Sequence, residues 1–173
     1  DAVLYGTVGS IIAHEITHGL DNNGKDYNET GVKENWWTAP DTLNFNKLTQ
    51  PLAEQFSSYP VMDNTYLNGK ITLGENIADL VGLQVAYEAF TQSSQFRDSK
   101  NIDGFTPTQR FLVAFAQQWR SKYTDQILKE YFLSDVHPPD NLRVNGTLSN
   151  FEPFYQSFNV QPAHALYRPQ LIR

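Results

Sequence analysis

Two histidines set four residues apart inside a helical pattern constrain this chain more than any other feature. They are His14 and His18, in the stretch "SIIAHEITHGLDNNG". Apolar residues recur every four positions around them, at Val8, Ile12, Ile16 and Leu20. This spacing predicts a helix over Val3–Leu20. Side chains at positions i and i+4 of a helix project from the same side, so both imidazoles can reach one metal ion.

Glu15 follows His14 directly and lies about 100° round the helix from it. It can reach a water bound to such an ion and act as a general base. This is the chemical reason for the three fixed residues of a His-Glu-x-x-His pattern. The alternative is a pair of histidines at the edge of the core, each hydrogen-bonded to its neighbours. Without partners, two imidazoles and a carboxylate beside apolar residues would cost several kcal/mol, which favours the metal site.

A catalytic zinc ion needs a third protein ligand and an open fourth position. Glu75 and Asp79 lie four residues apart in "TLGENIADLVGL", on one face of a helix predicted near Leu73–Phe90. The small residues Gly82 and Ala86 continue this face and would let another helix approach closely. Glu75 is therefore the candidate third ligand. Asp79, one turn deeper, is placed to accept the second ring N–H of a ligand histidine.

Thr72-x-x-Glu75 can also be interpreted as a capping box, in which Glu75 only satisfies the start of the helix. This alternative leaves Asp79 unexplained, because its carboxylate lies a full turn inside an otherwise apolar helix, where an unpaired charge is costly. The two acids and the two histidines together favour one zinc ion per chain, bound by His14, His18 and Glu75.

Composition excludes several classes of protein. The 173 residues correspond to about one domain, and 40% hydrophobic content is typical of a packed globule. A net charge of −6 without a lysine or arginine cluster argues against nucleic acid as a partner. No apolar run approaches the roughly 18 residues of a membrane span. Because cysteine is absent, disulfides, thiolate zinc ligands and cysteine nucleophiles are excluded.

The remaining elements are predicted from start and stop signals. Further helices are expected from Pro40–Asp41 to a residue before Pro60, from Thr106–Pro107 through "TPTQRFLVAFAQQWRSKY", and over Thr124–Leu133. From His137 onward the chain is rich in proline, glycine and asparagine, with one short strand candidate at Leu142–Val144. The expected fold is mainly α, with few or no strands of its own.

"HEITHGLDNNG" and "GENIADLVGL" together resemble the neprilysin / endothelin-converting-enzyme family of zinc metallopeptidases. The resemblance runs over nearly the whole chain, because "NWWT", "DGFTPTQRFLVAFAQQW" and "VHPPDNLRVNGTL" match the family's order and spacing. It implies a single catalytic domain over residues 1–173, the C-terminal catalytic part of a thermolysin-like (gluzincin) zinc peptidase. Animal members carry a cysteine near Thr49–Gln50, so this chain looks more like a cysteine-free bacterial member.

The resemblance also implies roles for individual residues. It makes His14, His18 and Glu75 the zinc ligands, Glu15 the residue that activates water, and Asp79 the residue that orients a ligand histidine. His137 and Arg143 match a family histidine and an arginine six residues later. By this analogy His137 steadies the oxyanion and Arg143 holds the substrate's backbone carbonyl. Without the resemblance, ordinary loop structure explains these two residues equally well.

Trp119 and Ile11 match family positions that line the pocket for the residue after the scissile bond. The implied preference is cleavage before a large apolar side chain. Core packing is the alternative explanation for both residues, since it is the commoner fate of a helical tryptophan or isoleucine.

The leading hypothesis is a zinc endopeptidase that acts on oligopeptides outside the cytoplasm (periplasmic, cell-surface or secreted), with a cytoplasmic location left open. The family's upstream lobe, which encloses the active site, has no counterpart here. We therefore expect this fragment to hydrolyse peptides poorly and its exposed apolar surface to favour self-association. The alternatives are a non-catalytic docking module with a structural zinc site, which would use four protein ligands, and an exopeptidase on the same scaffold.

Overall fold

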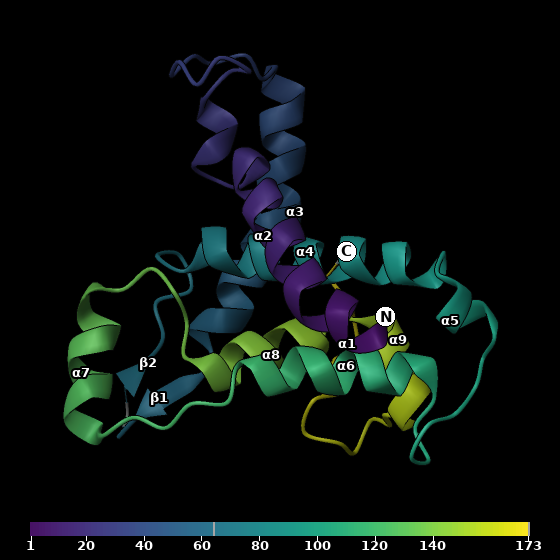
Figure 1. Ribbon diagram of the computed structural model, residues 1–173. Coiled ribbons are helices and arrows are strands. Elements are labelled where there is room, and N and C mark those ends of the chain that lie inside the picture. The colour runs from purple at the N-terminus through teal and green to yellow at the C-terminus, as the bar shows by residue number, and fades with distance from the viewer. Residues whose placement is uncertain (64, 173) are drawn as a thin grey trace.

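The computed structural model describes residues 1–63 and 65–172, without the side chains of residues 130–134. Its architecture is mainly helical, as Figure 1 shows. In chain order the helices are α1 Ala2–Leu4, α2 Ser10–Thr17, α3 Ala39–Ser57, α4 Leu73–Thr91, α5 Ser94–Arg97, α6 Pro107–Gln118, α7 Asp125–Ser134, α8 Asp140–Leu148 and α9 Glu152–Phe158. The strands β1 Pro60–Met62 and β2 Thr65–Tyr66 pair antiparallel. The prediction of a mainly helical fold with few strands is confirmed.

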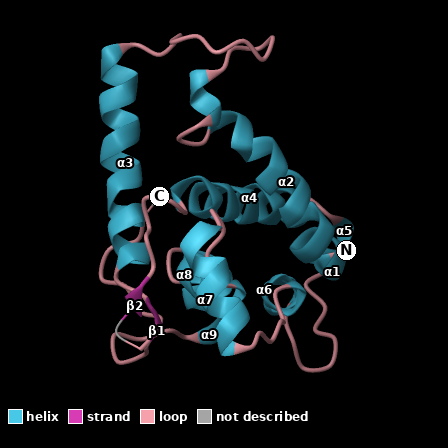
Figure 2. Cartoon of the chain, turned by 90° about the vertical axis from the view of Figure 1, so that its left-hand side faces the viewer, coloured by secondary structure: helices cyan, strands magenta, loops and turns pink. Residues whose placement is uncertain are grey.

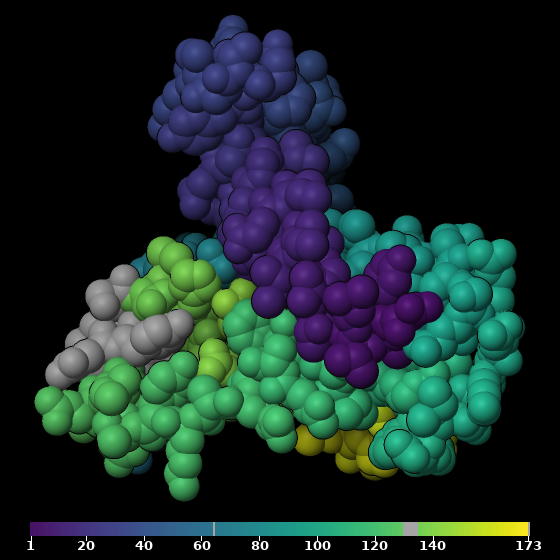
Figure 3. Space-filling view, viewed as in Figure 1, coloured from purple at the N-terminus to yellow at the C-terminus, as the bar shows by residue number. Residues whose placement is uncertain are grey.

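The N-terminal helix runs without a break through α1, a π-helical segment at Tyr5–Gly9, α2 and a 3-10 turn at His18–Leu20. The helix predicted over Val3–Leu20 is therefore confirmed. Its buried face is made of small or polar residues: Gly6, Ser10, Ala13, His14 and Thr17. The apolar residues whose spacing predicted the helix face outward, and Ile16 is 73% exposed. Figure 3 shows this segment, in purple, lying uncovered on the surface.

The small inner face allows α2 to cross α4 at close range. A Cβ atom at Gly82 would lie only 2.7 Å from the backbone nitrogen of His14, so no larger residue fits without moving one helix. The close helix approach expected at Gly82 is confirmed. Figure 1 shows the crossing of α2 over α4, which brings residues some sixty positions apart in sequence to one place.

Two apolar clusters hold α4 against the rest of the chain. One joins α4 to α6 and the C-terminal region through Leu83, Ala86, Phe90, Phe111, Phe115 and Phe151. The other joins α4 to α3 and α8 through Leu52, Phe56, Ile77, Leu80 and Leu142. Because α4 packs on both clusters, it is a fixed support for the acidic residues that it carries.

Helix α3 begins close to the predicted start at Pro40–Asp41, with a capping box between Thr38 and Asp41. Its N-terminal half and the preceding loop rise above the body of the molecule, as Figures 1 and 2 show. Trp36 and Leu48 on this projecting arm are more than half exposed. The arm therefore presents apolar surface to its surroundings.

The other predicted helices are found near their expected positions. Two predictions, one of a helix end and one of a strand, need correction. The helix that begins at Pro107 ends at Gln118, before the predicted "WRSKY". The strand candidate at Leu142–Val144 is wrong, because these residues lie inside α8. Within α8, Leu142 is buried in the second cluster while Val144 packs against the first. The short apolar run therefore contacts both clusters from one helix. None of the described helices combines the length and apolar character needed to cross a membrane.

Candidate metal centre and catalytic cleft

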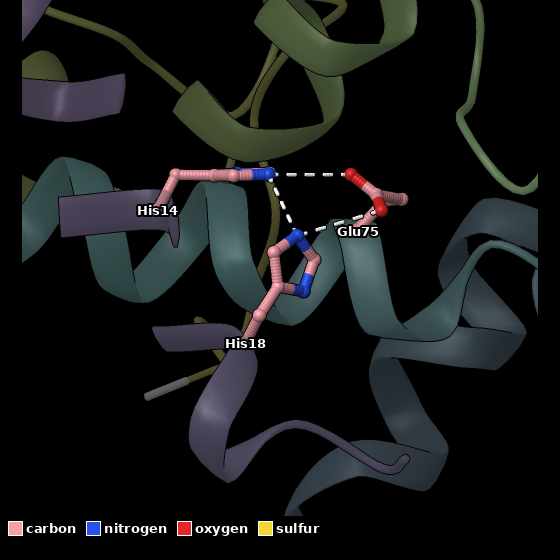
Figure 4. A group of neighbouring side chains, drawn as sticks. All are labelled: His14, His18 and Glu75. Carbon is pink, nitrogen blue, oxygen red and sulfur yellow. Dashed lines mark hydrogen bonds and ion pairs between the residues drawn. The ribbon is translucent and has the colours of Figure 1, made fainter. Parts of the chain in front are cut away.

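His14, His18 and Glu75 bring one ligand atom each to a common point between α2 and α4 (Figure 4). The two Nε2 atoms are 3.0 Å apart, and they lie 3.3 Å and 3.5 Å from the two carboxylate oxygens of Glu75. Donor atoms about 2.0–2.1 Å from a tetrahedral zinc ion are roughly 3.3 Å from one another. The three separations in this triangle of residues therefore match the donor spacing around a zinc ion, and nitrogen and oxygen are donors that zinc accepts.

The helix start at Thr72 does not use Glu75 as a cap. Thr72 makes no capping contact through its side chain. Its hydroxyl instead accepts a hydrogen bond from the side-chain amide of Asn76 at 3.0 Å. The capping-box interpretation is therefore wrong, and the Glu75 carboxylate is directed to the two histidines.

Each histidine of the triangle has a carboxylate on its other ring nitrogen. Nδ1 of His14 lies 2.8 Å from Oδ1 of Asp79, which is buried on α4. Nδ1 of His18 lies 2.7 Å from Oδ2 of Asp21. Such contacts fix the tautomer and the orientation of a ligand imidazole, so that Nε2 is free to face an ion.

Asp21 is the functional candidate that the sequence analysis missed. It is only 4% exposed, and its second oxygen accepts hydrogen bonds from the backbone N–H groups of Asn23 and Gly24, both at 2.7 Å. The carboxylate thus holds a tight turn and the His18 ring at once. The available signal was an aspartate three residues after the second histidine, but its contact depends on the 3-10 turn that ends the helix.

The acidic neighbours of His14 favour its protonated form in the metal-free protein. Burial opposes a charged His14 ring, but its contacts with Asp79 and Glu75 outweigh burial and raise the pKa of His14 to about 9. Burial would raise the pKa of Glu75, yet the contact with His14 and the fields of His137 and His18 hold that pKa below its ordinary value. An ion bound by a neutral imidazole would displace this proton.

A cavity of about 210 Å³ opens beside the triangle. Its lining contains seven residues predicted from the sequence, namely Ile11, His14, Glu15, Asp79, Trp119, His137 and Arg143. Ser10 and Phe115, which the sequence analysis did not single out, complete it. All nine predicted site residues therefore lie in this cavity or in the adjoining triangle.

His137 reaches the triangle from the loop before α8. Its Nε2 lies 3.2 Å from Oε2 of Glu75, and its Nδ1 lies 2.6 Å from Oδ1 of Asp135. Asp135 also accepts a hydrogen bond from the backbone N–H of His137 at 2.8 Å. Asp135, a second residue that the sequence analysis missed, therefore sets the direction of the His137 ring.

Arg143 on α8 lines the cavity and is only 7% exposed. Its Nε and one terminal nitrogen donate to the two oxygens of Asp79 at 2.8 Å and 2.7 Å. The guanidinium carbon sits 3.9 Å from the centre of the Trp119 ring. Arg143 is thus buried, ion-paired and stacked, although it also lines the cavity.

The helical fold and the His-His-Glu triangle together are the arrangement expected of the catalytic part of a thermolysin-like (gluzincin) zinc peptidase. Residues 1–172 match the family model described as Peptidase family M13, and the chain belongs to this family. The predicted resemblance to neprilysin and endothelin-converting enzymes is confirmed.

Individual relatives agree with this assignment. The chain is 38% identical to human neprilysin over 166 residues and 40% identical to an endothelin-converting enzyme homolog of Locusta migratoria over 158 residues, covering 93% and 89% of this chain. It spans 22% of the length of each of these two relatives.

Solved structures show the same likeness. The Mycobacterium tuberculosis zinc metalloprotease Zmp1, solved in complex with an inhibitor, superposes with a TM-score of 0.90 at 36% identity, covering 99% of this chain and 27% of that one. PepO from Lactobacillus rhamnosis gives a TM-score of 0.84 at 36% identity, covering 96% of this chain and 25% of that one.

Proposed function

We propose that this chain carries the catalytic centre of a zinc-dependent endopeptidase that hydrolyses oligopeptides, with His14, His18 and Glu75 holding one zinc ion. The observation that carries the proposal is the convergence of these three side chains. The two Nε2 atoms are 3.0 Å apart, that of His14 lies 3.3 Å from Oε2 of Glu75, and that of His18 lies 3.5 Å from Oε1. A bound zinc ion supplies Lewis-acid polarisation of a carbonyl oxygen and lowers the pKa of water.

The chain's own residues supply the remaining parts of peptide hydrolysis. Glu15 lines the cavity next to His14 without belonging to the triangle, so its carboxylate is available to take a proton from the attacking water and return it to the leaving amine. His137, oriented by Asp135, donates its Nε2–H toward the negative charge that develops on the carbonyl oxygen. Arg143 holds the substrate's backbone carbonyl beside the scissile bond.

The proposed preference is for cleavage before a large apolar residue. Ile11, Phe115 and Trp119 line the cavity beside the catalytic groups, so apolar side chains form one part of the wall that a substrate side chain would meet. An extracytoplasmic location also belongs to the proposal, on the resemblance alone. Fractionation of cells against a cytoplasmic marker enzyme tests that location.

Removal and return of the metal test the central proposal. Dialysis of the full-length protein against a chelator should abolish cleavage of an internally quenched peptide with both termini blocked. One equivalent of zinc should restore cleavage, and elemental analysis should find one zinc ion per chain. Cleavage that survives complete removal of the metal would contradict the proposal, whereas failure with blocked peptides alone would point to an exopeptidase.

Replacing Asp21 with asparagine should weaken zinc binding by about 10- to 100-fold, because His18 loses the carboxylate that orients its ring. The asparagine oxygen can still accept from the N–H groups of Asn23 and Gly24, so the turn is retained. Chelator competition measures the affinity. Asp26→Asn is the matched control, since Asp26 in the same loop pairs with Lys25. Equal affinities for the two variants would exclude an orienting role for Asp21.

A docking module with a structural zinc site remains the second candidate. The described residues bring three ligands to the triangle, one fewer than a closed structural site uses. The uncovered apolar residues of α2 and the projecting arm agree with the expected contact to an additional lobe or to a second copy of the chain. Sedimentation of the chain alone and within the full-length protein distinguishes a contact with an additional lobe from a contact with a second copy.

A further inference from the structure

Arg143, Asp79 and His14 form one continuous chain of contacts that leads from α8 through α4 to α2. The arginine grips both oxygens of Asp79 at 2.8 Å and 2.7 Å. The same Oδ1 that accepts from the arginine lies 2.8 Å from Nδ1 of His14. A bidentate arginine–carboxylate pair fixes the plane of the carboxylate, so the position of Oδ1 relative to the imidazole is set by Arg143.

The arginine is itself held from a second direction. Its guanidinium carbon lies 3.9 Å from the centre of the Trp119 ring, at the end of α6. The side chains of Arg143 and Asp79 are only 8% and 3% exposed, so water cannot substitute for either partner. Loss of Arg143 would leave the buried Asp79 carboxylate with its contact to His14 but without the two hydrogen bonds that fix its plane, and Asp79 would then be free to turn relative to the imidazole.

We infer that Arg143 is a positioning residue of the metal centre, which acts through Asp79 to hold the His14 ring with Nε2 in the zinc triangle. The inference rests on the proposed function only in taking the triangle as the zinc site. It adds a second role to the contact with the substrate carbonyl. The two roles are separable, because a substrate contact changes KM, whereas positioning changes zinc affinity when no substrate is present.

The test measures metal binding in Arg143→Lys and Arg143→Met variants of the full-length protein without substrate. Lysine keeps the charge but cannot form the two parallel hydrogen bonds, so both variants should bind zinc at least tenfold more weakly. The visible absorption of the cobalt-substituted protein should also change, since it reports the geometry of the ligands. Arg110→Met is the matched control, because Arg110 donates to the carbonyls of Lys100 and Phe105 and does not line the catalytic cavity.

A double-mutant cycle shows whether the effect passes through Asp79. If it does, the combined Asp79→Asn, Arg143→Met variant should lose no more zinc affinity than Asp79→Asn alone. Additive losses would overturn the inference, as would Arg143 variants with unchanged zinc affinity and cobalt spectrum and only a raised KM. Circular dichroism of the metal-free variants verifies that each is folded.

The failure of the proposed function has a different signature. Wild-type protein that binds zinc in the triangle but cleaves no peptide would overturn the proposed endopeptidase function. The double-mutant cycle on zinc affinity would still give a valid result. Wild-type protein that is folded but binds no zinc would overturn both.

Discussion

Glu15→Gln should lower kcat/KM for peptide cleavage by about 10²- to 10⁴-fold while zinc affinity stays within about twofold of wild type. The reason is the placement of Glu15, which lines the cavity beside His14 but contributes no atom to the triangle. Glutamine has the same shape and cannot accept the proton of the attacking water. Steady-state cleavage of a quenched peptide and chelator competition on the same preparation measure the two quantities.

Glu88→Gln is the control for this variant, since Glu88 is exposed on α4 and does not line the catalytic cavity. Its activity should match wild type. Glu15→Gln protein that retains a tenth or more of the wild-type activity would remove Glu15 from the role of general base. If zinc affinity fell together with activity, Glu15 would instead belong to the metal site. A wild-type protein that binds zinc, together with no effect of Glu15→Gln on any activity, would favour the docking module.

The helices α3 and α6 were predictable because their start signals are local. Thr38 and Thr106 each cap the N-terminus of a helix that has proline in its first turn, and both make the reciprocal contact three residues later. The His-His-Glu cluster was predictable for a similar reason. A spacing of four within each helix fixes the direction of the side chains, and Gly82 marks the place where the helices meet.

The sequence did not reveal which face of the first helix is buried. Apolar spacing identifies a helix, but the buried face is decided here by the contacts of His14 with Asp79 and by the small residues that admit α4. The apolar residues Val8, Ile12, Ile16 and Leu20 lie on the exposed face of the helix. Asp21 and Asp135 were missed because their contacts depend on the backbone path of a turn and a loop, which no regular spacing encodes.

Gly82→Ala should destabilise the protein by about 1–3 kcal/mol and weaken zinc binding at least tenfold. The new Cβ would lie 2.7 Å from the backbone nitrogen and 2.8 Å from Cα of His14, so α2 must shift away from α4. This shift moves His14 and His18 relative to Glu75, which comes from the other helix. Chemical denaturation of the metal-free protein and chelator competition measure the two effects.

The sign of the stability change makes this variant diagnostic. In the interior of an exposed helix, replacing glycine with alanine stabilises by roughly 0.5–1 kcal/mol, because the unfolded chain loses freedom. Gly19→Ala is the control, since a Cβ at Gly19, next to His18, would meet no atom within 4 Å. Gly82→Ala protein that is more stable than wild type would show that α2 and α4 do not pack this closely. The distances between the histidines and Glu75, which depend on that packing, would then not hold in solution.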